Sequence, residues 1–336
     1  MKTILVSGGL GFIGSHTVVE LLNNGFNVII IDNLVNSLID VFQKIITITN
    51  LTDKSRLQYY NIDIRSYLQL EKLFIDNHIY AIIHFASLKA VGESIKNPLE
   101  YYDNNVAGTI ALLQIMSKYN CKRIIFSSSA TVYGINTYPV SEDSKIGDGI
   151  TNPYGKTKYM LENILEDLYK SDNSWSIVIL RYFNPIGAHP SGLIGENPND
   201  IPNNLFPYLL KVAVGKLEKL NVFGDDYNTS DGTCIRDFIH VVDLAKGHIS
   251  SLNKLENSSI NIYNLGTGKG TTVLELINTF EKINNIKIKY DISQRRDGDL
   301  EVVYANSEKA FNELGWKSTY TVEDMCRHGY NFIKNL

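Results

Sequence analysis

The chain has 336 residues, a formal net charge of −4 at pH 7, 44% hydrophobic residues and 20% charged residues. This composition excludes a disordered, collagen-like or coiled-coil protein. The 32 basic and 36 acidic residues form no long run of one sign, and no stretch approaches the roughly 20 apolar residues of a membrane span. We therefore expect a globular protein with neither a nucleic-acid nor a membrane partner.

Short runs of Val and Ile alternate with helical patterns through the first half of the chain. The predicted strands are residues 4–6, 28–31, 57–62, 81–83, 123–126 and 177–180, and the predicted helices are residues 13–23, 67–76, 99–118 and 153–169. Strands without polar alternation are buried on both faces, which is typical of a parallel sheet covered by crossover helices. We therefore predict an α/β fold with a doubly wound parallel sheet.

The pattern changes after the last of these strands. Residues 184–204 are rich in Pro, Gly and Asn, which indicates a long loop. Shorter signals follow at residues 220–223, 237–242, 260–265 and 272–283, and a helix is predicted over 322–333. We predict two domains, residues 1–183 and a smaller C-terminal α/β substrate-binding lobe over 184–336, some segments of which return to the first domain.

Three glycines, Gly8, Gly11 and Gly14, stand directly after the first strand and before the first helix. Glycines there permit a tight turn and let backbone N–H groups approach a pyrophosphate, while the helix N-terminus supplies partial positive charge. Asp32, at the end of the second strand, stands where a carboxylate would accept hydrogen bonds from an adenosine ribose and repel a 2′-phosphate. The pattern predicts a Rossmann-type domain that binds NAD in preference to NADP.

The other candidate cofactor residues adjoin the glycine turn or follow a predicted strand, because ligands bind at the carboxyl ends of parallel strands. Asp63 and Ile64 are predicted to contact the adenine. The remaining candidates are Phe12, Ile13, Asn33, Phe85, Ala86 and Lys89.

Tyr154 and Lys158 lie one turn apart at the start of a predicted helix, so both side chains project from one face. The same spacing recurs at Tyr330 and Lys334, which we interpret as a chance match on a surface helix. Ser129, at the end of the fifth strand, distinguishes the first pair. Tyr154 is predicted to act as general base, because a neighbouring ammonium and a nicotinamide cation would each lower the pKa of its phenol, and a drop of about three units needs roughly 4 kcal/mol.

These residues and the strings FSSSATVYG, NPYGKTK, LRYFNPIGAHPSG and RDFIHVVDLA resemble the extended short-chain dehydrogenase/reductases, and most closely the UDP-galactose (UDP-glucose) 4-epimerases. The resemblance runs from residue 2 to beyond residue 316. It implies tightly held NAD and reversible conversion of UDP-glucose and UDP-galactose through a 4-keto sugar. It also implies a homodimer formed through helices 99–118 and 153–169.

The resemblance also assigns binding roles at matching positions. Asn104 and Phe183 would contact the cofactor, together with Tyr154 and Lys158, and Ser129 and Tyr154 would contact the sugar. The residues implied to hold UDP are Asn184, Asn204, Leu205, Phe223, Arg236, Arg296 and Asp299. Val303 falls where relatives carry either a bulky tyrosine or a small residue beside sugar carbon 2. A small residue there implies that UDP-GlcNAc and UDP-GalNAc are substrates as well.

Two other functions are weighed against the epimerase. A nucleotide-sugar dehydratase or decarboxylase of the same superfamily shares the fold, but dehydratases need an acid and a base directly after the strand-end hydroxyl residue. Ala130 and Thr131 stand there and cannot exchange a proton at neutral pH. A non-catalytic NAD-binding protein is the second alternative, because fold alone does not establish activity. Retention of Ser129, Tyr154 and Lys158 argues against it.

The cysteines and histidines suggest neither a disulfide framework nor a metal site. Cys121, Cys234 and Cys326 are widely spaced and odd in number, and the seven histidines lack the spacing of metal ligands. The N-terminus leads from a short apolar run into the glycine turn without a signal-peptide pattern. We expect a mature, cytoplasmic protein without a bound metal.

Overall fold

The computed structural model describes residues 1–198, 202–296 and 298–336. The chain divides into two compact units. Unit 1 comprises Met1–Gly134, Lys145–Arg181 and Ala245–Tyr263, and unit 2 comprises Ile135–Ser144, Tyr182–Leu244 and Asn264–Leu336. Each unit is therefore built from segments that are distant in the sequence.

A seven-stranded sheet forms the centre of unit 1, in the strand order β11-β6-β5-β4-β1-β2-β3. The strands are β1 (Thr3–Ser7), β2 (Asn27–Ile31), β3 (Leu57–Tyr60), β4 (Ala81–His84), β5 (Arg123–Ser129), β6 (Ser176–Tyr182) and β11 (Ser259–Leu265). Strand β1 pairs in parallel with β2 and with β4, so Val6 lies between Ile30 and Ile83. Successive strands are added on both sides of β1, so the crossover helices lie on both faces of the sheet. The predicted α/β class with a doubly wound parallel sheet is confirmed.

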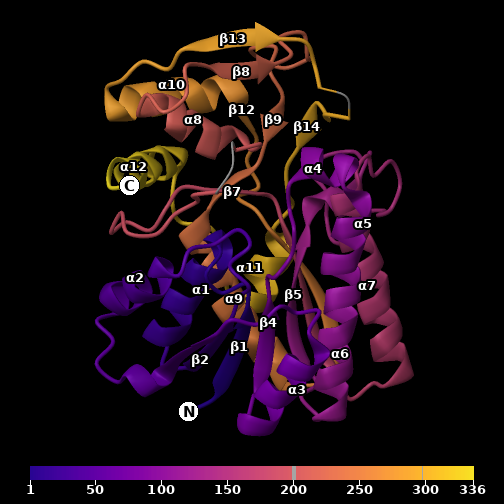
Figure 1. The fold of residues 1–336 in the computed structure, drawn as a ribbon. Helices are drawn as coiled ribbons and strands as arrows, with labels where there is room; N and C mark the ends of the chain where they lie inside the picture. The colour runs from indigo at the N-terminus through magenta and orange to yellow at the C-terminus, as the bar shows by residue number, and fades with distance from the viewer. Residues whose placement is uncertain (199–201, 297) are drawn as a thin grey trace. The chain divides into compact units, whose positions relative to one another are not determined.

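Helices cover both faces of this sheet (Figure 1). Helices α3 (Tyr67–Asp76), α6 (Gly108–Lys118) and α7 (Pro153–Ser171) share one core with the sheet. In that core Leu73, Met116 and Leu165 of the helices pack with Leu5 and Ile124 of the strands. Helices α1 (Phe12–Asn23) and α2 (Asp40–Thr49) lie on the other side of the sheet. Burying such a side chain stabilises the fold by roughly 1.5–3 kcal/mol.

The helix predicted over residues 99–118 is helical throughout but not uniform. It consists of α5 (Pro98–Tyr101), a π-helical turn η2 (Tyr102–Ala107) and α6. Among the α-helices that precede β5, α2 and α4 (Val91–Lys96) were not predicted. Helix α2 is rich in Ile and Thr, which have low helix propensity, and it buries little apart from Ile45.

Four further helical segments connect these strands and helices. They are η1 (Lys54–Arg56), η3 (Ala130–Tyr133), α9 (Val241–Ser251) and η4 (Leu252–Glu256).

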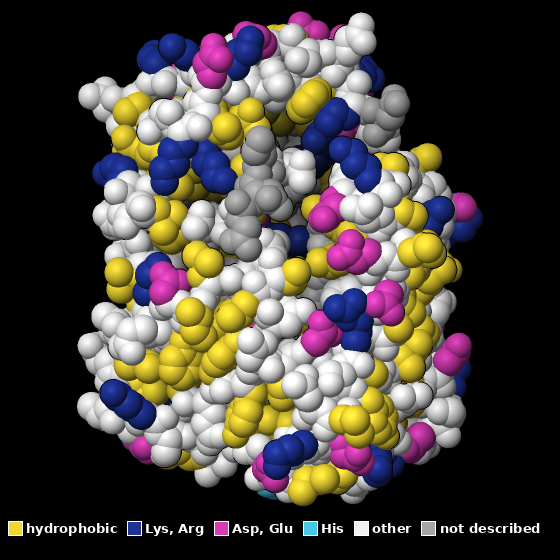
Figure 2. Space-filling model, in the orientation of Figure 1, with side chains coloured by type: hydrophobic (Ala, Val, Ile, Leu, Met, Phe, Trp, Pro, Cys, Tyr) yellow, Lys and Arg dark blue, Asp and Glu magenta, His cyan; other side chains and the backbone are white. Residues whose placement is uncertain are grey.

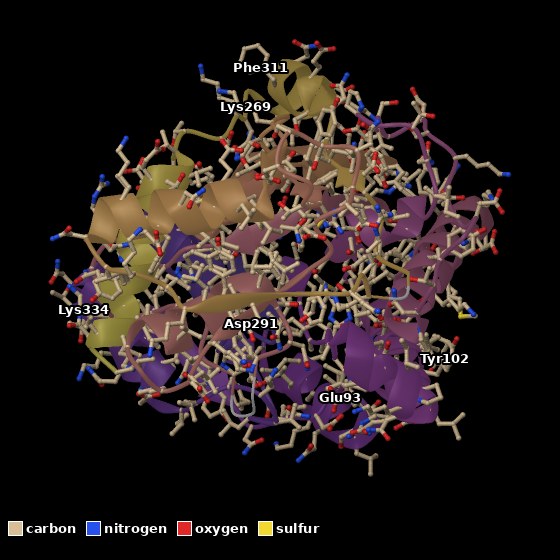
Figure 3. The ribbon with its side chains drawn as sticks, turned by 90° about the horizontal axis from the view of Figure 1, so that it is seen from above. Glu93, Tyr102, Lys269, Asp291, Phe311 and Lys334 are labelled. Atoms are coloured by element: carbon tan, nitrogen blue, oxygen red, sulfur yellow. The ribbon has the colours of Figure 1, made fainter. Side chains whose placement is uncertain are left out.

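Unit 2 contains three small sheets and its own core. The strands are β7 (Asn184–Ile186) with β10 (Phe238–His240), β9 (Ile235–Arg236) between β12 (Thr271–Thr272) and β14 (Val302–Val303), and β8 (Leu220–Phe223) with β13 (Tyr290–Ser293). Helices α8 (Leu205–Ala213), α10 (Val273–Asn284) and α12 (Val322–Lys334) surround a core that includes Phe206, Phe280 and Met325. A further helix, α11 (Glu308–Leu314), carries the exposed Phe311, labelled in Figure 3.

The stretch predicted as a long loop, residues 184–204, begins with strand β7, and its residues 199–201 lie outside the described part of the chain. Among the helices that the structure describes, none is both long and apolar enough to cross a membrane.

Candidate active site

The glycine turn between β1 and α1 has the close approach that the sequence predicts. Gly8 has a φ of +70°, and a Cβ on Gly14 would stand 2.2 Å from the Gly8 carbonyl oxygen. The Gly11 amide donates to that same oxygen at 3.1 Å. Any side chain at Gly14 would therefore push helix α1 away from the turn, so glycine there lets the helix N-terminus pack closely against the turn.

Asp32, at the end of β2, is buried and accepts three hydrogen bonds from the chain. Its Oδ2 accepts from the Leu10 amide at 3.0 Å, and its Oδ1 accepts from the Leu34 amide at 3.0 Å and the Ser37 hydroxyl at 2.8 Å. Three donors fix the carboxylate beside the glycine turn. A carboxylate oxygen has further lone pairs, so this geometry fits a ribose diol that donates to it.

Asp63 lies in a charged network that the sequence did not suggest. Arg65 donates from Nε to Oδ1 at 2.9 Å and from Nη2 to Oδ2 at 2.8 Å, and Asn33 donates to Oδ2 at 2.9 Å. These bonds hold the pKa of Asp63 well below its usual range. Arg65 also reaches Asp103 at 2.8 Å. The predicted cofactor residues Asn33 and Asp63 are thus brought together, and Arg65 orients the Asp63 carboxylate.

The segment after β4 returns to the glycine turn. The amides of Phe85 and Ala86 both donate to the Ser7 carbonyl, at 2.9 and 3.1 Å. The Lys89 ammonium lies 5.6 Å from the centre of the Phe12 ring. Four predicted cofactor residues, Phe12, Phe85, Ala86 and Lys89, therefore lie along one edge of the sheet in unit 1.

Asn104 is buried in η2 and donates to Asn105 at 2.9 Å. Asn105 in turn accepts from the Leu88 amide at 2.8 Å and donates to the Thr157 hydroxyl at 3.1 Å. It therefore joins the loop after β4 to helix α7. No sequence pattern points to Asn105 apart from its position beside Asn104.

Helix α7 begins at Pro153 with Asn152 as its N-cap, whose side chain accepts from the Gly155 amide at 2.9 Å. Proline at the first helical position and an asparagine cap are both favourable helix starts. This start presents Tyr154 to Ser129, the last residue of β5, whose hydroxyl acts to lower the pKa of the Tyr154 phenol.

Lys158 is buried one turn further along α7. Its ammonium donates to the Ser127 carbonyl at 2.8 Å and lies 5.9 Å from the centre of the Tyr154 ring. The three predicted catalytic residues are therefore brought together in unit 1.

The predicted lowering of the Tyr154 pKa is not supplied by the chain's own groups. Burial raises the pKa of Tyr154, and the nearby Ser129 hydroxyl offsets this only in part. Burial also lowers the pKa of Lys158 to about 7, although the charge of Glu162 opposes that change. The predicted phenolate also needs the nicotinamide cation, so it stays a prediction, and burial is the effect that the cation and Lys158 would have to overcome.

The predicted UDP-binding residues are distributed over unit 2. Arg236 of β9 is in register with Val303 of β14, and both side chains are half-buried. The Arg296 guanidinium lies 4.7 Å from the centre of the Phe223 ring and donates from Nε to Asp299 at 3.0 Å. An arginine held on an aromatic face with free donors is suited to diphosphate oxygens.

The other residues of this group are placed by backbone contacts. The Asn184 amide of β7 donates to the Asp237 carbonyl at 2.9 Å, and the amide of the buried Phe183 donates to the Leu265 carbonyl at 3.3 Å. Asn204 is the N-cap of α8, and Leu205 is its first residue.

Sequence reasoning missed Asp237, which organises this part of unit 2. Its buried carboxylate accepts from the Thr267 amide at 2.8 Å, the Thr267 hydroxyl at 2.6 Å, the Gly268 amide at 3.0 Å and the Ala305 amide at 3.1 Å. Its own amide donates to the Val303 carbonyl at 3.0 Å. Asp237, directly after Arg236, thus holds the backbone of Thr267 and Gly268 and the segment from Val303 to Ala305. Among the described residues, no group of three or more His, Cys, Asp or Glu could hold a metal ion.

The doubly wound sheet, the glycine turn and the Ser–Tyr–Lys set of unit 1 are together characteristic of the extended short-chain dehydrogenase/reductases. A protein-family model described as GDP-mannose 4,6 dehydratase matches residues 5–329. The bifunctional UDP-glucose 4-epimerase and UDP-xylose 4-epimerase 1 of Pisum sativum is 53% identical over 338 residues, which cover 99% of this chain and 96% of the relative.

The UDP-glucose 4-epimerase of Bacillus subtilis (strain 168) is 52% identical over 331 residues, covering 98% of this chain and 96% of the relative. The crystal structure of the UDP-glucose 4-epimerase of Bifidobacterium longum, in complex with NAD⁺ and UDP, has a TM-score of 0.95 at 50% identity and covers 99% of this chain and 98% of that one. The chain belongs to the family of the UDP-glucose 4-epimerases.

Proposed function

We propose that this protein interconverts UDP-glucose and UDP-galactose by inverting carbon 4 of the hexose, with NAD as its cofactor. The observation that carries this proposal is the set of Ser129, Tyr154 and Lys158, assembled at the carboxyl end of β5 in a unit that also contains the glycine turn and Asp32. The family of the chain and the NAD and UDP in the Bifidobacterium longum structure support it.

The residues of unit 1 fit NAD. Gly8, Gly11 and Gly14 would leave room for the pyrophosphate at the N-terminus of α1, and Asp32 would accept from the adenosine ribose. Lys158 would bind the nicotinamide ribose. When bound, NAD supplies reversible acceptance of the hydride from sugar carbon 4. The contributions of Ile13, Ile64, Asn104 and Phe183 to the same site are part of the proposal.

Tyr154 would take the proton of the sugar 4-hydroxyl and later return it, while the Ser129 hydroxyl holds the same oxygen. A phenol with a raised pKa is a poor base, so Tyr154 needs positive charge close to its oxygen. Lys158 supplies one such charge when it is an ammonium. Ala130 and Thr131, the first residues of η3, follow Ser129 directly. Neither is an acid or base, which favours epimerisation over the dehydration named by the family model.

Unit 2 would hold the nucleotide. Arg236 and Arg296 are suited to the diphosphate oxygens, and Asp299 to the ribose diol. The further residues in this proposal are Asn184, Asn204, Leu205 and Phe223. Firm attachment through UDP would leave the hexose free to present either face, which inversion requires.

We further propose that UDP-GlcNAc and UDP-GalNAc are substrates. Val303 is half-buried and lies opposite Arg236 in the strand register, within the group proposed to bind UDP. A valine leaves the space that a tyrosine side chain would fill, so an N-acetyl group on sugar carbon 2 could be accommodated.

A homodimer is proposed through one side of unit 1. Helices α4 to α7 expose apolar side chains there, and Leu99 is 81% exposed. Figure 2 shows hydrophobic side chains on the side where Figure 1 has α6 and α7, and Tyr102, labelled in Figure 3, belongs to the same segment. The other exposed apolar residues of these helices are Val91, Ile95, Ile110 and Met160.

Light scattering tests this dimer. Leu99→Lys should yield a monomer, and Leu68→Lys, at an exposed position of α3, should not. A dimer that persists in Leu99→Lys protein would contradict the proposed interface. The three free and buried cysteines accord with a cytoplasmic location, which cell fractionation would test.

The decisive experiment incubates the purified protein with UDP-galactose, with and without added NAD, and follows both hexose epimers by NMR. Conversion is expected. Tyr154→Phe protein should lose activity by at least about 100-fold and still bind NAD, because it lacks only the proton-transferring hydroxyl. Tyr330→Phe is the matched control, since Tyr330 lies near Lys334 with the same spacing on α12. Absence of conversion even with NAD would refute the proposed function.

A further inference from the structure

Helix α7 presents three polar side chains to strand β5 at successive turns: Tyr154, Lys158 and Glu162. Each contacts a different one of the serines at residues 127–129. Tyr154 lies beside the third hydroxyl, Lys158 donates to the carbonyl of the first, and the second hydroxyl donates to the Glu162 carboxylate. The first two contacts belong to the proposed catalytic set, and the third lies directly behind them.

Glu162 is fully buried, and its carboxylate is held on both oxygens. Arg181 of β6 donates from Nε to Oε1 at 3.1 Å and from Nη2 to Oε2 at 2.7 Å, with side-chain exposures of 2% for Arg181 and 1% for Glu162. Arg181 also donates to the Tyr133 hydroxyl at 3.0 Å. Burial acts to lower the pKa of Arg181, but its bonds to Glu162 raise it above the ordinary value. The pair is therefore charged and rigid.

A buried ion pair of this kind contributes little net stability, because desolvation of both charges offsets their attraction. Its position suggests another role. Lys158, one turn before Glu162, has lost most of its hydration, and burial lowers its pKa to about 7. The charge of Glu162 acts in the opposite direction.

The other titratable groups that face Lys158 bring no negative charge at neutral pH. His84 of β4 lies between the Ser7 and Thr109 hydroxyls, and burial together with the charge of Lys158 lowers its pKa to about 3. Tyr154 on α7 is kept as a phenol by burial. The favourable electrostatic support for an ammonium at Lys158 thus comes from the same helix, one turn away.

We propose that Glu162 is a positioning residue: through Ser128 and Arg181 it fixes the register of α7 on β5, and its charge keeps the Lys158 side chain as an ammonium beside Tyr154. The catalytic consequence rests on the proposed function, because Lys158 stabilises the phenolate that would accept the sugar proton only when Lys158 is positively charged. The titration of Lys158 can be measured without turnover, so it tests the role of Glu162 separately from the epimerase activity.

Glu162→Gln tests the proposal, because the carboxamide keeps the shape and one accepting oxygen but removes the charge. The Lys158 side chain would be titrated by NMR in lysine-labelled protein, its signal assigned by its absence in Lys158→Met protein. The midpoint should fall by about one pH unit or more in Glu162→Gln protein. Glu166→Gln is the matched control one turn further along α7, and its midpoint should equal that of the unaltered protein.

The kinetic consequence is a change in pH dependence rather than a uniform loss. In Glu162→Gln protein the alkaline limb of the kcat profile should move to lower pH by the same amount as the midpoint, with KM unchanged. A structural defect alone would lower kcat equally at every pH.

The single variant leaves Arg181 without its partner, so a double variant, Glu162→Gln with Arg181→Met, removes both buried charges and guards against misfolding. Circular dichroism would verify the fold of both variants. The midpoint of the Lys158 titration in the double variant should also lie below that of the unaltered protein. An unshifted midpoint in either folded variant overturns the proposal, whereas a shifted midpoint in a protein without epimerase activity supports it and refutes the proposed function instead.

Discussion

Gly14→Ala tests the cofactor assignment most directly, because the structure sets the size of the perturbation. The added Cβ would stand 2.2 Å from the Gly8 carbonyl oxygen and 2.9 Å from the Gly9 Cα, whereas real Cβ atoms do not approach closer than 3.0 Å. Helix α1 and the turn must separate by about 0.8 Å to relieve the first contact. Overpacking of this kind costs about 1–3 kcal/mol.

The strain falls on the turn that would hold the pyrophosphate, so the Kd for NAD should rise about 5- to 150-fold. Calorimetric titration of cofactor-free protein with NAD measures this, and thermal unfolding without NAD separates lost affinity from lost stability. Gly92→Ala is the matched control, because nothing lies within 4 Å of its Cβ position in α4. Folded Gly14→Ala protein that binds NAD as tightly as the unaltered protein would refute the assignment.

Three further substitutions address specificity and stability. Val303→Tyr should lower the activity on UDP-GalNAc relative to UDP-galactose by at least about tenfold, and an unchanged ratio in coupled assays would contradict the pocket assignment. Asp32→Asn should reduce the preference for NAD over NADP by about tenfold, measured as the ratio of the two Kd values, because it removes the charge that repels a 2′-phosphate. His84 has a folded pKa of about 3 against 6.5 for the free side chain, so the unfolded state binds the extra proton and stability falls as pH drops between these values. His84→Gln should make that decline shallower by about 1.4 kcal/mol per pH unit in denaturant titrations, and an identical slope would exclude His84 as its source.

Features with a strong local signal could be predicted from the sequence. The buried Val and Ile runs located six strands of the central sheet, and the glycines between the first strand and helix located the turn. The start of α7 was predicted correctly at Pro153. The roles of the individual site residues stay predictions until the variants are measured.

Features that depend on distant partners could not be predicted. Strand β11 was expected from its apolar residues, but its pairing beside β6 at the edge of the central sheet is non-local. Arg65 and Asp237 look like ordinary surface charges in the sequence, and only folding shows that they fix Asp63 and the backbone around Val303. The effect of burial on the pKa of Tyr154 was not evident either, because desolvation depends on the packed surroundings.

The π-helical turn η2 has a consequence for helical phase. A π-helical turn accommodates one residue more than an α-helical turn, so the side chains before it are rotated by about 100° relative to those of a continuous α-helix. This offset lets α6 direct Leu112 and Met116 to the core while Asn104 and Asn105 are buried beside α7 and Leu99 stays exposed. Removal of a single residue from η2 would restore α-helical phase and turn the interior asparagines and the exposed leucine away from their present directions together.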